Sequence, residues 1–361
     1  GSNYSSKGIP FFRSQNIYNN GLVYEDIKFI SEDIHQTMIG TEVLPNDLLL
    51  NITGGSLGRC AIVPANFQRG NVSQHVCIMR PILVVSEYFH AFVLSSSFSK
   101  SIKITGSGRE GLPKYNLERI FFPLPPLTEQ YRIVSEIEHW FALINQIEQD
   151  KLDLQEAIKQ AKNKILNIAI HGKLVPQDPS DEPASELLKR INPKAEITCD
   201  NAHYTQLPKG WAICRLEQIT DYEQPTDYIV ESTDYDTSYS TPVLTAGKSF
   251  IIGYTNETTG IYSNLPCIIF DDFTTDSKLV NFPFKVKSSA MKILKVNQNV
   301  EIDYVAIFMS ITRLIGDTHK RYWISEYSKL EIPIPPQKEQ KRIVFAVHSI
   351  FAKLDMIMES L

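Results

Sequence analysis

Apolar residues recur at alternating steps of four and three along the middle of the chain. The series follows a Pro-Leu-Pro-Pro motif at residues 123–126 and lies in a stretch, residues 127–171, that contains neither glycine nor proline. Lys151 interrupts it. A stripe of this kind predicts a helix roughly 65 Å long that buries one seam against another helix. The seam positions are Ile133, Ile137, Trp140, Ile144, Ile147, Leu154, Ile158 and Ile165.

The same pattern returns near the end of the chain. The segment Pro-Leu-Pro-Pro-x-x-Glu-Gln-x-Arg-Ile-Val at residues 123–134 recurs with one change at residues 333–344, an offset of 333 − 123 = 210. The stripe then continues in phase, which indicates a duplicated unit. Because a helix can begin only after the prolines, each copy predicts a domain followed by its own helix. The second seam consists of Ile343, Val347, Ile350, Leu354 and Ile357.

The segments before the two helices carry short strand patterns, and they predict a mixed α/β fold. The expected strands are residues 9–12, 47–52, 60–63, 76–79, 241–244, 267–270, 284–286 and 291–294, with helices at residues 87–104, 183–191 and 304–314. The predicted organisation is a first domain at residues 1–126, a long helix at 127–172, a linker with a short helix at 173–206, a second domain at 207–332 and a second helix at 333–361.

Each long helix has the other as its simplest partner. An antiparallel pair would relate the repeats by an approximate two-fold axis and separate two globular domains by a coiled coil. Two such domains at a fixed separation suit duplex DNA, whose successive major-groove faces lie roughly 34–36 Å apart. The second helix stops at Leu361, which matches Lys151 of the first. The seam from Leu154 to Ile168 is therefore expected to lack a mate within the chain.

Composition changes this picture little. The net charge of −5 is not typical of a nucleic-acid binder, although lysines and arginines gather in residues 95–120 and 275–297. The five cysteines form no C-x-x-C pair, which argues against a zinc site or a disulfide framework and fits a reducing cytoplasm. There is no apolar run of membrane-spanning length and no Walker A, H-E-x-x-H or G-x-S-x-G motif. The leading Gly1-Ser2 looks like a tag remnant.

Several motifs now point to one family. Besides the repeated helix motif, the chain contains Ile-Ala-Ile-His-Gly-Lys-Leu-Val-Pro-Gln at residues 168–177, Leu-Pro-Lys-Gly-Trp at 207–211 and Phe-Asp-Asp-Phe-Thr-Thr at 270–275. Over essentially its whole length the sequence resembles the specificity subunit of type I restriction-modification systems. In the second copy, Leu-Pro-Lys-Gly-Trp opens the domain; the first copy lacks such an opening and so looks trimmed at its N-terminus.

The resemblance implies a non-catalytic cytoplasmic subunit. Each domain would be a target recognition domain reading one half of a bipartite, asymmetric DNA site. The helices would set the spacer and dock two methyltransferase subunits. Those partners would bind S-adenosylmethionine, and a restriction subunit would bind ATP, so no cofactor is expected in this chain. The open seam would accept a missing N-terminal segment, a second copy of the chain or a methyltransferase subunit.

Two other functions stay open on the sequence. A coiled-coil scaffold with two protein-binding domains would bind partners without DNA readout. A fragment of a fused restriction-methyltransferase enzyme would bind S-adenosylmethionine by itself, although the chain has neither a cofactor-binding G-x-G strand end nor an N-P-P-Y-like loop.

Polar residues in turns next to strands are the expected DNA contacts, because Gln and Asn pair with adenine edges and Arg or Lys with guanine or phosphate. In the first domain they are Ser14, Gln15, Asn16, Thr53, Ser56, Arg59, Gln74, His75, Ser107, Arg109 and Lys114. In the second they are Thr245, Lys248, Thr274, Thr275, Lys278, Ser288, Thr318, His319, Lys320 and Arg321. Each could instead cap a turn or be a solvated surface group. No catalytic residue is predicted, and Asp271-Asp272 without a companion carboxylate predicts no metal site.

Overall fold

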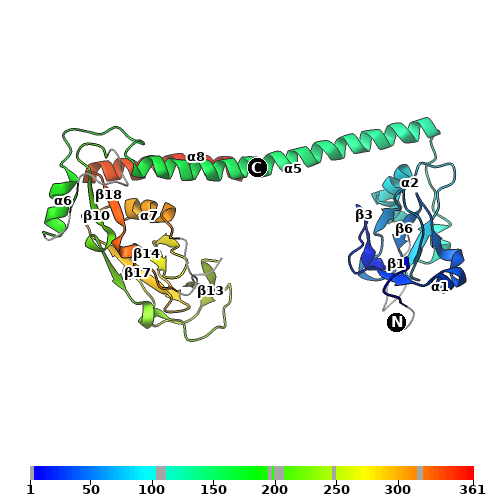
Figure 1. Ribbon diagram of the computed structural model, residues 1–361, viewed down its shortest axis with the longest axis horizontal. Helices are drawn as coiled ribbons and strands as arrows, with labels where there is room; N and C mark the ends of the chain where they lie inside the picture. The colour runs from blue at the N-terminus through cyan, green and yellow to red at the C-terminus, as the bar shows by residue number, and fades with distance from the viewer. Residues whose placement is uncertain (1–3, 103–110, 194–196, 199–206, 246–248, 315–319) are drawn as a thin grey trace. The chain divides into compact units, whose positions relative to one another are not determined.

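The computed structural model describes residues 4–102, 111–193, 197–198, 207–245, 249–314 and 320–361. The chain divides into two compact units, Gly1–Gln149 and Asp150–Leu361. The boundary falls inside the long helix α5 (Leu127–Ile170), so this helix contributes to both units. Each unit mixes strands and helices, as the sequence pattern predicts (Figure 1).

The described residues of the first unit form two small sheets, a hairpin and short helices. In order across the sheets, the strands are β4 (Lys28–Ile30), β1 (Ile9–Phe12), β8 (Gly70–Val72) and β5 (Glu42–Val43), and then β7 (Cys60–Ile62), β6 (Leu48–Asn51) and β9 (Val76–Met79). The hairpin is β2 (Ile17–Tyr18) with β3 (Gly21–Leu22), and the helices are α1 (Glu32–Thr37), α2 (Ser86–Val93), α3 (Ser96–Ser101) and α4 (Lys114–Leu117). All four residues of β6 are buried, because this apolar run has a strand on each side.

The predicted helix at residues 87–104 is two helices. The chain breaks between α2 and α3 because Ser95 caps the second of them. Its backbone is extended and its hydroxyl accepts a hydrogen bond from the Phe98 N–H at 3.3 Å. Serine is a preferred N-cap residue and competes with continuation of a helix.

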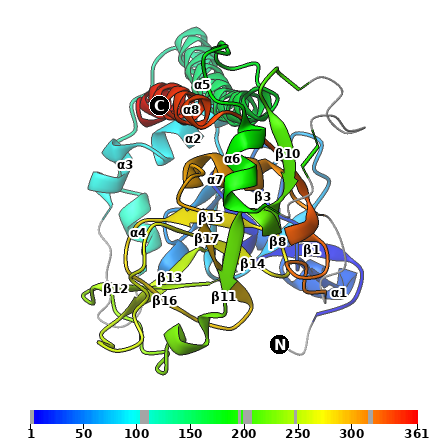
Figure 2. The same ribbon diagram turned by 90° about the vertical axis from the view of Figure 1, so that its left-hand side faces the viewer.

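In the part of the second unit that the structure describes, there are three small sheets. In order across each sheet, the strands are β13 (Ile251–Thr255), β12 (Thr241–Leu244) and β16 (Lys285–Val286), then β11 (Thr220–Glu223), β17 (Met291–Val296), β14 (Cys267–Asp271) and β15 (Ser277–Val280), and finally β10 (Ala212–Arg215) with β18 (Glu331–Ile334). Its helices are α6 (Ala184–Ile191), α7 (Ile302–Ile311) and α8 (Gln337–Glu359), besides the end of α5. Figure 2 shows α7 above the sheet that contains β14 and β17.

The two units repeat one strand scheme. β1 pairs in parallel with β8 as β12 pairs with β16, and β6 lies between β7 and β9 as β14 lies between β15 and β17. Individual hydrogen bonds recur as well. The Ser73 N–H donates to the Phe12 carbonyl at 2.9 Å, and the Lys287 N–H donates to the Leu244 carbonyl at the same distance. The duplication read from the helices therefore extends through the domains.

The long helix ends where the sequence predicts. Gly172 has a φ of +66°, and a Cβ at this position would lie 2.3 Å from Cγ of Pro208. Glycine is required here on both counts, since other residues are strained at positive φ and there is no room for a side chain.

The end of α5 and α8 lie side by side and run antiparallel (Figures 1 and 2). Lys162 forms an ion pair with Asp355, and the ammonium of Lys151 donates to the carbonyl of Leu361. Beyond the end of α5, Gln177 donates to Glu339 at 3.1 Å. Leu166 and Ala169 of α5 share an apolar core with Ile343 and Val347 of α8.

This pairing corrects the expected position of the open seam. Ile158 is buried and Ile165 packs against the shared core, whereas both were expected to lack a mate. The exposed positions of the first seam are Trp140, Ile144, Ile147 and Leu154, with Ile133 and Ile137 partly buried. The expectation paired residues of the two helices that are 210 positions apart, which would hold only if the helices ran parallel. In an antiparallel pair, the end of α8 meets Lys151 and its start meets the end of α5.

Candidate nucleic-acid interface

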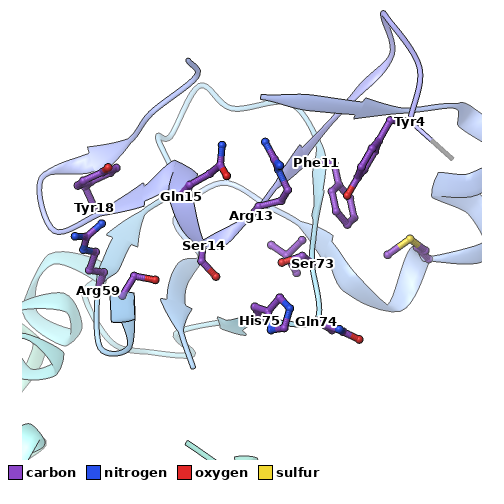
Figure 3. Close-up of a pocket in the computed structure, with 13 residues that line it drawn as sticks. Tyr4, Phe11, Arg13, Ser14, Gln15, Tyr18, Arg59, Ser73, Gln74 and His75 are labelled. Atoms are coloured by element: carbon purple, nitrogen blue, oxygen red, sulfur yellow. The ribbon is translucent and has the colours of Figure 1, made fainter. Parts of the chain in front are cut away.

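An open groove of about 780 Å³ lies beside the end of β1 in the first unit (Figure 3). Polar side chains come from three segments, namely the turn after β1, the turn before β9 and the loop between β6 and β7. The lining residues are Tyr4, Phe11, Arg13, Ser14, Gln15, Tyr18, Met38, Ser56, Arg59, Val72, Ser73, Gln74 and His75.

A buried amide holds two of these segments together. Asn51 ends β6 and is fully buried, and its Nδ2 donates to the Ser14 carbonyl at 2.9 Å and to the Ser56 hydroxyl at 3.2 Å. The turn after β1 and the loop after β6 are thus fixed relative to each other. The sequence analysis did not select Asn51, because its role depends on contacts between segments far apart in the chain.

Arg13 and Gln15 are oriented by one carboxylate. The guanidinium of Arg13 donates to both the backbone carbonyl and the carboxylate of Asp26, at 2.8 and 3.2 Å, and Gln15 donates to the same carboxylate at 3.1 Å. Asp26 has a φ of +51°, in the left-handed region that aspartate tolerates better than most residues. Hydrogen bonds from Lys28, Arg13 and Gln15 lower the pKa of Asp26 to about 2.

Arg59 is held differently. Its guanidinium lies over the ring of Tyr18, 4.6 Å from the ring centre. Arg69 and Arg80 of the same unit are paired with Glu32 and Asp47. Within the described residues, Arg59 forms no such ion pair. A stacked, planar guanidinium that faces an open groove can receive the two acceptors of a guanine edge or a phosphate.

Six predicted contacts of the first domain line this groove: Ser14, Gln15, Ser56, Arg59, Gln74 and His75. Thr53 does not line it, but its hydroxyl lies 2.9 Å from Nδ1 of His75 and orients that ring. The groove also contains residues that the sequence analysis missed, above all Arg13 and Tyr18. The signal for them was an arginine directly after an apolar strand and a tyrosine in the following turn.

Of the four other predicted contacts of the first domain, two lie within the described residues and neither lines the groove. Asn16 is fully buried, and its amide donates to the carbonyls of Val23 and Glu25, so it stabilises the turn and is a correction to the prediction. Lys114 begins α4 and pairs with Glu118 at 3.6 Å. Ser107 and Arg109 lie outside the described residues.

The second unit has a smaller groove of about 370 Å³ at the matching place, beside the end of β12. Its lining residues are Thr245, Phe250, Ile269, Asp271, Thr274, Asp276, Ser277, Lys278, Met291 and Arg313. Asp271 is buried and accepts hydrogen bonds from the Phe273 N–H and from the Thr274 hydroxyl. Lys278 lies over the ring of Phe250, 4.4 Å from its centre.

Among the predicted contacts of the second domain, Thr245, Thr274 and Lys278 line the groove. Thr275 is fully buried, where its hydroxyl accepts from the Leu314 N–H, and this corrects its expected exposure. Ser288 is exposed, and Lys320 pairs with Glu326. Arg321 lies 5.9 Å from the centre of the Phe273 ring. The last three, Lys248, Thr318 and His319, fall outside the described residues.

The two grooves share a position but differ in charge. Arg13 follows β1 as Thr245 follows β12, because each comes directly after the strand residue paired with its parallel neighbour. Among the described residues, the first groove is lined by two arginines and no carboxylate. The second is lined by Asp271 and Asp276 together with Lys278 and Arg313. Donors in the first and mixed donors and acceptors in the second would match different base edges.

The described residues offer little for catalysis. They include no group of three or more His, Cys, Asp or Glu side chains that could hold a metal ion. The described cysteines are free thiols, and burial raises the pKa of Cys214 to about 12, so this thiol is not an activated nucleophile. Among the described helices, none is long and apolar enough to cross a bilayer.

Comparison with known proteins gives these grooves a context. The family model of the type I restriction modification DNA specificity domain matches residues 2–157. The chain is 50% identical over 135 residues to the type I restriction enzyme EcoR124I/EcoR124II specificity subunit of Escherichia coli, a match covering 36% of this chain and 33% of that protein. Over these stretches it is similar to type I specificity subunits. The resemblance read from the repeated helix motif is confirmed.

A longer match runs to the EcoAI specificity subunit of Escherichia coli, with 25% identity over 365 residues, 76% of this chain and 61% of that protein. The chain therefore spans between a third and three fifths of these two relatives. Two solved structures share the fold over nearly all of the chain. One, from a study of complex assembly in the type I R-M system, has a TM-score of 0.60 at 14% identity, covering 100% of this chain and 89% of that chain. The other, the HsdS subunit from Thermoanaerobacter tengcongensis, has a TM-score of 0.53 at 14% identity, covering 99% and 88%.

Proposed function

We propose that this chain is a non-catalytic DNA-recognition subunit in which each unit reads one half of a bipartite, asymmetric site. The observation that carries the proposal is the pair of grooves. They stand at the same place in a duplicated fold, yet one is lined by two arginines and the other by two aspartates, a lysine and an arginine. A shared scaffold with different polar linings is what two different half-sites require.

The long helices would set the spacer between the half-sites and dock methyltransferase subunits. Support for a docking role comes from α5. Its middle exposes several large apolar side chains that no described residue covers, which marks an interaction surface. They are Trp140, Phe141, Leu143, Ile144 and Ile147. We assign S-adenosylmethionine and ATP binding to the methyltransferase and restriction subunits, in a cytoplasmic complex, and no cofactor to this chain.

The test is DNA binding by the purified chain together with its methyltransferase partners. We expect a salt-dependent preference for the methylation motif of the source genome over scrambled DNA. Each half of the motif is then scrambled separately. Gln74→Ala in the first groove should weaken discrimination at one half only, and Lys278→Ala in the second groove at the other half only. Equal binding of motif and scrambled DNA would refute the function.

The exposed stripe on α5 also favours a second candidate, a scaffold whose two domains bind proteins. That protein would bind its partners with equal affinity in the presence and absence of DNA, and neither groove substitution would alter any sequence preference. A fragment of a fused methyltransferase would instead bind S-adenosylmethionine as an isolated chain, which isothermal titration would detect.

A further inference from the structure

Gln130 lies in the first turn of α5, and its side chain is almost fully buried, at 1% exposure. Its Oε1 accepts a hydrogen bond from the backbone N–H of Val85 at 2.9 Å. Its Nε2 donates to the carbonyl of Pro125 at 2.9 Å. Val85 is the residue from which α2 starts, so one amide joins the domain, the proline segment and the long helix.

Gln340 repeats this arrangement in the second unit. It is fully buried in the first turn of α8. Its Oε1 accepts from the N–H of Glu301 at 2.9 Å, and its Nε2 donates to the carbonyl of Pro335 at 2.9 Å. Glu301 is the residue from which α7 starts. We call each of these two-bond arrangements a glutamine clasp.

A tyrosine supports each clasp. The hydroxyl of Tyr88 in α2 donates to the carbonyl of Pro123 at 3.0 Å, and that of Tyr304 in α7 donates to the carbonyl of Pro333 at 2.7 Å. These prolines have no N–H, so their carbonyls are the backbone groups through which the segment can be held. In both units the same domain helix therefore bonds the proline segment through its tyrosine and the long helix through the N–H at its start.

The hydrogen bonds of the two glutamines differ from those of an ordinary helix cap. A cap satisfies the free N–H groups at the start of its own helix. The clasp amide instead accepts from the start of a different helix, one that belongs to the globular domain. Its loss would leave a buried donor and a buried acceptor without partners at the junction between the domain and its long helix.

We propose that Gln130 and Gln340 are positioning residues that fix the angle between each recognition domain and its long helix, and so restrict the protein to one spacer length between the half-sites. The inference rests on the proposed function. A domain of this size has a radius of gyration of about 14 Å, so a tilt of about 15° moves its far side by several ångströms. That displacement is comparable with the rise of about 3.4 Å between successive base pairs.

The experiment measures binding of the chain with its methyltransferase partners to a series of sites. Both half-sites stay constant, and the spacer is shortened or lengthened by one and two base pairs. The variants are Gln130→Ala, Gln340→Ala and the double variant. The matched control is Gln160→Ala, since this exposed glutamine of α5 bonds only to Glu156 in the preceding turn, at 3.3 Å.

We expect the wild type and the control to lose about tenfold or more in affinity when the spacer changes by one base pair. The clasp variants should bind all spacers within about threefold of one another, and weaker than the wild type at the optimal spacer, while base preferences within each half-site stay unchanged. Lower affinity with an unchanged spacer profile would overturn the inference, because a purely structural role predicts that result.

The experiment also distinguishes misfolding of the variants and failure of the proposed function. If the alanine variants do not fold, as judged by circular dichroism, Gln130→Met and Gln340→Met replace them. Each fills a similar volume and loses both hydrogen bonds of the clasp. A flattened spacer profile in these variants supports the clasp, and a wild-type profile overturns it. If the wild-type complex shows no half-site preference at all, the proposed function itself has failed.

Discussion

Arg13 and Arg59 enter the same groove with different freedom. Asp26 holds the guanidinium of Arg13 through its carboxylate and its carbonyl, which uses part of the arginine's hydrogen-bonding capacity. Arg59 lies over the face of Tyr18, and within the described residues it forms no ion pair that would occupy its N–H groups. Arg59 is therefore the better candidate for reading a base edge, and Arg13 for shaping the wall beside it.

The first prediction concerns Arg59→Ala. A bidentate contact to guanine discriminates by about 1–3 kcal/mol, so the variant should lose preference at a single position of one half-site. Competition binding against sites changed one base at a time measures this. Arg69→Ala is the control, because Arg69 is exposed and paired with Glu32 at 2.8 Å. Uniform weakening on all sequences, with a smaller salt dependence, would instead mean that Arg59 contacts phosphate.

A buried ion pair lies beneath the second groove. Lys292 and Asp272 are 3.3 Å apart and almost fully buried, and Asp272 also accepts from the Trp323 N–H at 2.8 Å. Removing the lysine by Lys292→Met leaves this carboxylate without its cation. Breaking such a pair costs about 3–5 kcal/mol, so the urea midpoint should fall clearly.

The first unit suggests a double variant that should restore part of the lost stability. The strand registers place Ile52 and Cys77 where the second unit has Asp272 and Lys292. The double variant Asp272→Ile/Lys292→Cys should therefore be more stable than Lys292→Met, although the Trp323 N–H loses its acceptor. A double variant no more stable than the single one would mean that the pair is indispensable to this fold.

At the scale of elements, the antiparallel contact between α5 and α8 divides the apolar stripe of α5 into covered and exposed parts. Ile158 is 6% exposed and Ile147 is 67% exposed, although both occupy seam positions in the sequence. Only the covered part can contribute burial energy within the chain.

This division predicts different losses of stability for substitutions in the covered and exposed parts of the stripe. Ile158→Ala should destabilise the protein by about 2–5 kcal/mol, since it removes buried methyl groups and leaves a cavity. Ile147→Ala should change stability by less than about 0.5 kcal/mol. Urea midpoints of the isolated chain compare the two. The opposite order would mean that α8 pairs with the earlier part of α5.

The fourth prediction concerns pH and the start of α8. Burial raises the pKa of Glu339, so the folded chain holds this proton more tightly than the unfolded chain. Stability should then fall as pH rises from the ordinary glutamate pKa through the raised value. Glu339→Gln removes this titration, and its melting temperature should exceed that of the wild type at pH 7 but not below about pH 4.

Glu129 is the matched control, because it occupies the same place in the first copy of the motif. It is partly exposed and forms an ion pair with Arg132. Glu129→Gln should not reproduce the gain at pH 7. If both variants gain equally, the effect comes from the helix terminus rather than from burial of Glu339.

At the scale of the whole molecule, the duplicated fold combines a repeated scaffold with turns that differ between the two units. The shared hydrogen bonds of the strands and clasps preserve the scaffold, while the turns at the strand ends carry different side chains. The helices that follow the domains carry the remaining part of the repeat. A ruler role for these helices predicts that their length changes the DNA spacer without changing what either domain reads.

The fifth prediction tests the ruler. A seven-residue insertion in the exposed part of α5, after Ile144, adds about 10 Å of helix, or about three base pairs. The preferred spacer should lengthen while both half-sites keep their sequences, as methylome sequencing would show. An insertion after Ile158 needs a matching one in α8 to preserve the pairing. Changed half-sites would contradict the ruler.

The sequence alone predicted much of this protein, because local patterns encode it. Apolar residues that recur every second position predicted the main strands, and apolar residues at steps of three and four predicted the long helices. The repeat of this pattern in phase predicted the duplication. Short strands such as β5 and β10 escaped, since a few residues carry too weak a pattern. Six of the first domain's predicted contacts line its groove, because polar turns after buried strands gather at one sheet edge.

The tertiary structure decided what the local pattern leaves undetermined. Asn16 and Thr275 have the residue types of surface contacts, yet they satisfy backbone groups inside the protein. Trp140 and Ile158 belong to one stripe, yet only the second is covered, because helix direction sets which positions meet. Gln130 and Gln340 are polar residues in the first turns of the two long helices, and only the fold brings each of them to a second helix. Each of these outcomes depends on contacts between distant segments.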